Sequence, residues 1–108
     1  MEKKTQEKIQ TLQLLEQNLQ NFLMQKQQFQ VQLVEIESAL SELGKAKEAY
    51  KIVGNIMVSS DKDSLEKELK EKQETFGIRI KSIEKQENSI KDKAKKLQEE
   101  VLGEMKEK

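Results

Sequence analysis

Apolar residues recur every three or four positions in two long stretches of the chain, with a short β-rich stretch between them. The positions reached by these steps of three and four are called the seam. In the first stretch nine of the ten seam positions are apolar, and Lys26 is the exception. The nine are Leu12, Leu15, Leu19, Phe22, Phe29, Leu33, Ile36, Leu40 and Leu43. An average spacing of 3.5 residues keeps one stripe of side chains facing a partner helix. The pattern predicts a coiled-coil helix over residues 5–44.

The second stretch repeats this pattern and predicts another coiled-coil helix over residues 61–104. Its apolar seam positions are Leu65, Leu69, Phe76, Ile80, Ile83, Ile90, Ala94, Leu97 and Val101, with Lys72 and Glu87 at the other two. Two successive steps of four, through Lys72 to Phe76 and Ile80, predict a stutter that relaxes the supercoil. Lys26, Lys72 and Glu87 are expected to extend from the seam to water.

The signals for the ends of the two helices fall where the apolar seams end. Gly44 follows the first seam and predicts a left-handed C-terminal cap. Ser60 and Asp63 each precede an acidic residue by three positions, so either could be the N-terminal cap of the second helix. Because the seams match in length and period, we expect the chain to reverse and the helices to pair antiparallel, rather than form two parallel dimers.

Between the helices, residues 50–59 predict a β-hairpin. Gly54-Asn55 is a two-residue loop with glycine first, as a type II′ turn requires, since that position needs a positive φ. This turn places Val53 opposite Ile56 and the next pairs along the strands opposite each other, namely Ile52 with Met57 and Lys51 with Val58. The alternative interpretation is an unstructured linker.

Both faces of this hairpin are apolar, and neither edge has a partner strand in the sequence. An isolated two-stranded hairpin is marginally stable in water, and its free edges favour pairing with other chains. We therefore predict an obligate oligomer in which the hairpins of several chains join in a larger intersubunit β-sheet or β-barrel. The predicted oligomerisation residues are Tyr50, Ile52, Val53, Gly54, Asn55, Ile56, Met57 and Val58.

The composition agrees with a mainly α chain that has little compact core. Only 34% of the 108 residues are hydrophobic while 37% are charged, and proline is absent. So polar a chain could be disordered. Against that alternative, the 20 basic and 20 acidic residues balance, and the apolar residues keep a strict period.

Residue types that usually carry catalysis are missing. There is no histidine or cysteine, and no glycine-rich phosphate loop or convergent carboxylate pair, so we expect no enzyme activity, no metal site and no cofactor. The Lys91, Lys93, Lys95 and Lys96 cluster is interleaved with Asp92 and followed by Glu99 and Glu100, which favours a solvated helix face over a nucleic-acid contact. No apolar run could span a membrane, and glutamines follow Met1–Lys4 where a signal peptide would be apolar. We expect a cytoplasmic protein.

The segment from Tyr50 to Val58, flanked by coiled-coil helices and followed by residues 65–72 (LEKELKEK), resembles the β-class subunits of prefoldin. About 21 residues separate the two seams, which leaves room for one hairpin, whereas α-class subunits carry two. The resemblance implies a heterohexamer of two α-class and four β-class subunits whose hairpins form a double β-barrel. It also implies an ATP-independent chaperone that holds unfolded proteins at the distal ends of its coiled coils and passes them to a group II chaperonin.

Apolar residues near both chain ends fit such a holding surface. Ile9, Leu14, Leu102 and Met105 lie off the seam, and we expect Leu12, Leu15, Leu97 and Val101 to join them where the helix ends fray. Scattered exposed apolar residues are also ordinary in proteins, and the seam could simply broaden there. A further off-seam group, Leu23, Met24, Val31 and Val34, is expected to widen the seam or contact a neighbouring subunit. A coiled-coil scaffold without client binding remains the alternative function.

Overall fold

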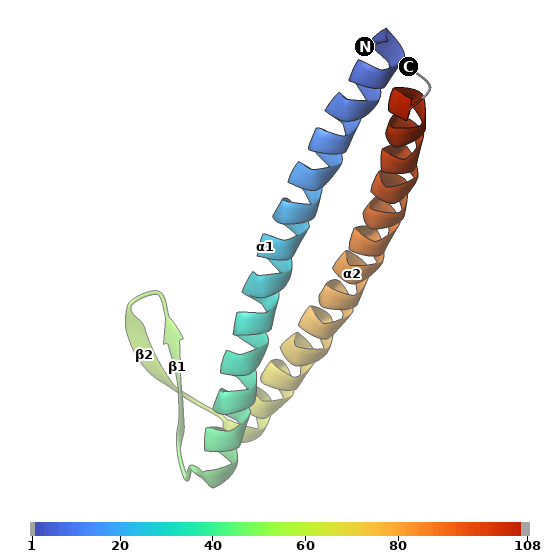
Figure 1. The fold of residues 1–108 in the computed structure, drawn as a ribbon. Helices are drawn as coiled ribbons and strands as arrows, with labels where there is room; N and C mark the ends of the chain where they lie inside the picture. Colours follow the sequence, from blue (N-terminus) through green and yellow to red (C-terminus); the bar gives the residue numbers. More distant parts are fainter. Residues whose placement is uncertain (1, 107–108) are drawn as a thin grey trace. The chain divides into compact units, whose positions relative to one another are not determined.

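The computed structural model describes residues 2–106, which form two helices with a hairpin between them (Figure 1). Helix α1 (Lys3–Lys45) is followed by strand β1 (Ala49–Val53), strand β2 (Ile56–Ser60) and helix α2 (Lys62–Lys106). Residues before 28 and after 80 form one compact unit, called here the terminal unit, and residues 28–80 form the hairpin unit. The predicted fold class, two long helices around a central antiparallel hairpin, is confirmed.

The α1 seam lies where the sequence predicts it. All nine predicted apolar seam positions are buried or half-buried, and Ile36 and Leu43 are each only 8% exposed. The same spacing continues toward the N-terminus through Lys8 and Thr5, both of which are also shielded from solvent. The seam of α1 is therefore longer than its apolar residues indicate.

The seam of α2 differs from the prediction at one position. Lys72 is exposed, whereas the neighbouring Gln73 is half-buried. With Gln73 in the seam, the two successive steps of four run from Leu65 through Leu69 to Gln73, so the predicted stutter is present but lies one step earlier in α2. The physical reason is that a neutral amide is less costly to remove from water than an ammonium group.

Side-chain contacts within each unit confirm the antiparallel pairing. In the hairpin unit the rings of Phe29 and Phe76 lie with centroids 5.5 Å apart, and the Arg79 guanidinium is 5.7 Å from the Phe29 ring centroid. In the terminal unit Thr5, near the start of α1, donates a hydrogen bond to Glu104, near the end of α2. An early residue of α1 thus meets a late residue of α2, as antiparallel helices require.

The helix ends are capped by residues other than those predicted. A left-handed cap requires a positive φ, and within residues 2–106 only Gly54 has one, so Gly44 is an ordinary helical residue of α1. After it, the Ala46 N–H donates to the Leu43 carbonyl (3.2 Å). At the start of α2 the cap is Asp61, whose carboxylate accepts from the Ser64 N–H (3.2 Å). The predicted caps at Gly44, Ser60 and Asp63 are therefore wrong, because α1 continues to Lys45 and α2 begins at Lys62, directly after Asp61.

Candidate functional site

The hairpin has the register that the turn prediction requires. Val53 pairs with Ile56, Ile52 with Met57 and Lys51 with Val58. Gly54 has a φ of 62°, and no other residue in 2–106 has a positive φ. A positive φ at the first loop position alone distinguishes a type II′ turn from type I′. The predicted turn type is confirmed.

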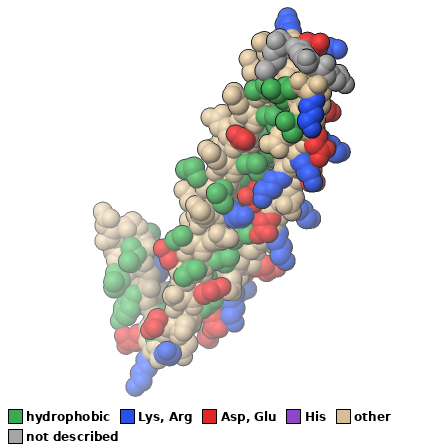
Figure 2. Space-filling view, viewed as in Figure 1, with side chains coloured by type: hydrophobic (Ala, Val, Ile, Leu, Met, Phe, Trp, Pro, Cys, Tyr) green, Lys and Arg blue, Asp and Glu red, His purple; other side chains and the backbone are tan. Residues whose placement is uncertain are grey.

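The hairpin exposes almost all of its apolar side chains. The exposed fractions are 53% for Tyr50, 69% for Ile52, 57% for Val53, 66% for Ile56, 65% for Met57 and 41% for Val58. The sheet consists of β1 and β2 alone, so both of its edges are unpaired in the described chain. Figure 2 shows hydrophobic side chains on the hairpin surface in view. All the predicted oligomerisation residues therefore lie together on one exposed ribbon.

Polar contacts at the base of the hairpin hold it against α2. The Lys51 ammonium lies 3.1 Å from a Glu68 carboxylate oxygen, and this contact lowers the pKa of Glu68. Lys51 pairs with Val58, so these two side chains share the face directed toward α2. Ile52 and Met57 lie on the opposite face. The Tyr50 hydroxyl donates to Glu48 (2.7 Å), which raises the pKa of Tyr50.

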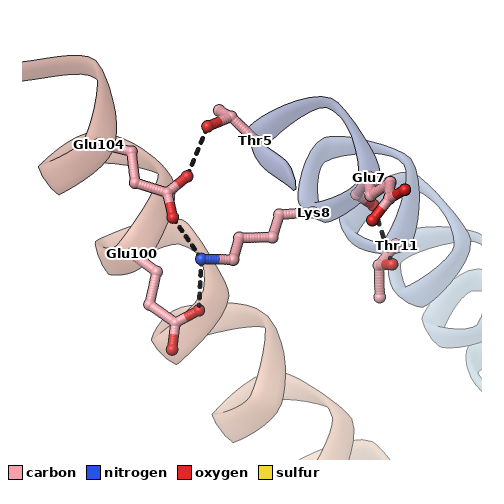
Figure 3. Close-up of polar contacts among 6 residues, drawn as sticks. All are labelled: Thr5, Glu7, Lys8, Thr11, Glu100 and Glu104. Atoms are coloured by element: carbon pink, nitrogen blue, oxygen red, sulfur yellow. Dashed lines mark hydrogen bonds and ion pairs between the residues drawn. The ribbon is translucent and has the colours of Figure 1, made fainter. Parts of the chain in front are cut away.

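Four polar side chains join the helices at the ends of the terminal unit (Figure 3). Thr5, only 2% exposed, donates through Oγ1 to Glu104 (2.5 Å). Lys8 donates to the same carboxylate, and its Nζ also lies 3.4 Å from Glu100. The bond from Lys8 is the main cause that lowers the pKa of Glu104, and the same bond raises the pKa of Lys8.

The structure divides the predicted client-binding residues into two groups. Leu14, Leu102 and Met105 are exposed by 57%, 57% and 51%. The others are shielded, since Ile9, Leu12, Leu15 and Leu97 are half-buried and Val101 is only 7% exposed. The expected fraying is not seen, because α1 is helical from Lys3 and α2 is helical to Lys106.

The sequence contained a signal for three of the four polar side chains at this end. Counting the seam backward from Leu12 gives positions 8 and 5, and counting it forward from Val101 gives position 104. These positions are occupied by Lys8, Thr5 and Glu104, which an apolar pattern search passes over. They extend the helix pairing by hydrogen bonds and an ion pair beyond the last apolar residues.

The contact between Glu104 and Lys8 predicts a pH response of the last turn of α2. Because the pKa of Glu104 is lowered, the contact stabilises the paired helix ends at any pH above the ordinary pKa of a glutamate. This stabilisation is lost as the pH falls through the lowered pKa. We expect Glu104→Gln to accelerate amide hydrogen exchange in residues 101–106 at neutral pH. Glu99→Gln, which changes an exposed carboxylate five residues earlier on α2, is the control. Equal exchange in both variants would contradict the prediction.

A second ion pair lies inside the seam of the terminal unit. Lys26 Nζ is 2.8 Å from Glu87 Oε1, and the two side chains are only 21% and 8% exposed. The hydrogen bond with Glu87 raises the pKa of Lys26. The expectation that these side chains extend separately to water is wrong, because each charge is compensated by the other across the helices.

Within residues 2–106, no group of three or more carboxylates is arranged to hold a metal ion. No helix in the same range is long and apolar enough to cross a membrane.

The fold and the exposed ribbon define a class of protein, namely helical subunits in which an antiparallel coiled coil presents a β-hairpin. The family model of prefoldin subunits matches residues 6–108, so the chain belongs to the prefoldin family. Relatives described as prefoldin subunit beta place it with the β subunits. That of Archaeoglobus fulgidus is 40% identical over 93 residues, covering 83% of this chain and 80% of the relative. That of Thermococcus onnurineus is 39% identical over 89 residues, covering 80% and 77%.

A solved structure agrees with this assignment. The crystal structure of the prefoldin beta subunit from Thermococcus strain KS-1 superposes with a TM-score of 0.86 at 33% identity, covering 94% of this chain and 92% of that one. Prefoldin subunits are non-enzymatic chaperone components and form oligomeric complexes. Membership in the family therefore implies a chaperone function for this chain.

Proposed function

We propose that this chain is the β-class subunit of an ATP-independent cytoplasmic chaperone that holds unfolded proteins and passes them to a group II chaperonin. Its hairpin joins an α-class subunit and further β-class copies in a heterohexamer. The observation that carries the proposal is the exposed apolar ribbon of β1 and β2, which has two unpaired edges.

Assembly through the hairpin is supported by the small buried area of the ribbon and by its unpaired edges. Six apolar side chains between Tyr50 and Val58 are at least 41% exposed. Two strands with solvent on both faces have too little buried area to be stable by hydrophobic burial. Pairing with hairpins of other subunits supplies the missing hydrogen bonds at the edges and covers the apolar faces.

Client binding is supported by apolar side chains of the terminal unit. Leu14, Leu102 and Met105 are each more than half exposed, and Figure 2 shows hydrophobic side chains near the chain ends on the face in view. Leucine and methionine adapt to varied apolar surfaces, which suits binding without sequence specificity. The half-buried Ile9 of α1 and the shielded Leu12, Leu15, Leu97 and Val101 complete the proposed surface if the helix ends separate on binding.

The holding activity is tested with a denatured, aggregation-prone client in the absence of nucleotide. We expect the assembled protein to suppress light scattering from the aggregating client. The variant with serine at Ile9, Leu14, Leu102 and Met105 is expected to lose that protection and keep its native mass, because none of the four is part of the hairpin. Full protection by this variant would contradict the site, and no protection by the unmodified protein would favour the scaffold alternative.

The proposed partner subunit is tested separately. Native mass spectrometry of the chain alone, and after mixing with an α-class prefoldin subunit, measures the stoichiometry directly. We expect a species with two α-class and four β-class chains. A mass that does not change on mixing would contradict the heterohexamer but leave the holding activity open to the scattering test.

A further inference from the structure

Glutamines follow the exposed side of α1 in the terminal unit at a regular spacing. They stand at positions 6, 10, 13, 17, 20 and 27, and all six are exposed. Steps of four and three connect these positions, and the one intermediate position, 24, is occupied by Met24. The steps of three and four equal those of the seam, so these side chains form one stripe along the helix. Because the stripe is offset from the seam by one or two residues in every turn, it lies on the side of α1 away from α2. We call it the glutamine stripe.

The two helices of the terminal unit differ sharply in charge. Between Lys8 and Lys26, Glu16 is the only charged residue of α1. In contrast, thirteen of the 26 residues from 81 to 106 of α2 are charged. Outer positions of coiled coils are commonly Glu or Lys, and these residues are as good helix formers as glutamine. Charged residues on the outer side of α1 would therefore form a helix and keep the protein in solution equally well, so neither requirement explains their absence.

Large apolar side chains lie within and beside the glutamine stripe. Met24 is 62% exposed, Leu14 57% and Leu23 43%. Met24 continues the stripe itself, while Leu14 and Leu23 flank it on either side. The outer side of α1 thus combines neutral amides with exposed apolar groups over most of the helix in this unit.

This combination matches the chemistry of an unfolded polypeptide. A non-native segment exposes backbone N–H and C=O groups together with apolar side chains, and the glutamine amide both donates and accepts hydrogen bonds. An uncharged surface also avoids the cost of removing charged groups from water when a client covers it. The flexible Met24 adapts to side chains of different size.

We propose that the glutamine stripe, with Leu14, Leu23 and Met24, is a client-contact surface that extends binding along the outer side of α1. Its occupant is an extended, non-native polypeptide segment with few charges, and the charged outer side of α2 makes no equivalent contact. This inference rests on the proposed holding function and specifies which helix carries the client.

The test replaces amides by carboxylates of nearly the same size on each helix. Gln13→Glu with Gln20→Glu changes the stripe, and Gln86→Glu with Asn88→Asp makes the matched change at exposed positions of α2. Protection of a denatured client is titrated by light scattering. We expect the α1 variant to need about tenfold more protein for half-maximal protection, because the lost amide hydrogen bonds and the buried charges act together. The α2 variant is expected to match the unmodified protein.

Site-specific photocrosslinking gives a second readout that does not depend on added charge. A photoreactive side chain at position 20 is expected to crosslink a labelled denatured client, whereas the same group at Ser89, an exposed position of α2, is not. Equal crosslinking from both helices, or unchanged protection by the α1 variant, would overturn the inference while the holding function stands. A changed native mass of the α1 variant would also overturn it, since the stripe would then be a subunit contact. Absence of protection by the unmodified protein would instead remove the holding function itself.

Discussion

Replacing Ile52 and Ile56 with aspartate is expected to convert the assembly into single chains. Their side chains lie on opposite faces of the hairpin and are 69% and 66% exposed. Aspartate therefore costs little in the isolated chain but would be buried without a partner charge in a β-barrel between subunits. Sedimentation velocity, with and without an α-class subunit, measures the change. Circular dichroism should show unchanged helix content, because both substitutions lie outside α1 and α2.

The chain offers a matched control for this experiment in the same unit. Val31 and Val34 on α1 are 57% and 61% exposed, so replacing both with aspartate removes a similar apolar area from a helix instead of the ribbon. We expect this variant to keep the mass of the unmodified assembly. An assembly that survives the isoleucine substitutions would refute assembly through the hairpin. Dissociation of the valine variant would show that α1 also contributes a subunit contact.

The register of the hairpin was predictable to the residue because its determinants are local, although its strands extend one residue further at each end than predicted. A two-residue loop with glycine first fixes the turn type, and the turn type fixes the pairing of Val53 with Ile56 and every pair beyond it. The exposed fractions agree with the inference that this ribbon cannot bury itself. The strands proposed to cover it belong to other chains, and no pattern within one sequence specifies the number or order of those chains.

The seams were predictable in period but not at every position. The spacing of apolar residues predicts a seam position at Lys72, three residues after Leu69. In the structure Gln73 is the shielded side chain instead. The apolar pattern also stops at Leu12 and Val101 although the pairing continues through Thr5, Lys8 and Glu104. In both places a polar residue occupies a seam position, and only its contacts with the partner helix reveal the role. The same limit applies to Asp61, whose cap depends on where α2 begins.

The ion pair between Lys26 and Glu87 is expected to have the largest effect on stability of any polar contact in the terminal unit. Replacing Lys26 with leucine leaves the Glu87 carboxylate, whose side chain is 8% exposed, without its partner in an otherwise apolar seam. We expect the melting temperature to fall by roughly 5 °C or more. Glu87→Leu is expected to be milder, because the longer Lys26 side chain is 21% exposed and reaches water more easily.

The double variant with leucine at both positions separates stability from pairing specificity. Two leucines fill the seam without any buried charge, so the melting temperature should return to that of the unmodified protein or exceed it. What the leucines cannot supply is a preference for one alignment, since apolar side chains pack acceptably in several registers, whereas Lys26 meets Glu87 in only one. Spin labels on α1 and α2 within the terminal unit should therefore give one narrow distance distribution in the unmodified protein and a broader one in the double variant. A double variant that is as unstable as Lys26→Leu would mean that leucine does not fit this part of the seam. A distribution as narrow as that of the unmodified protein would mean that the apolar residues alone set the alignment of the helices.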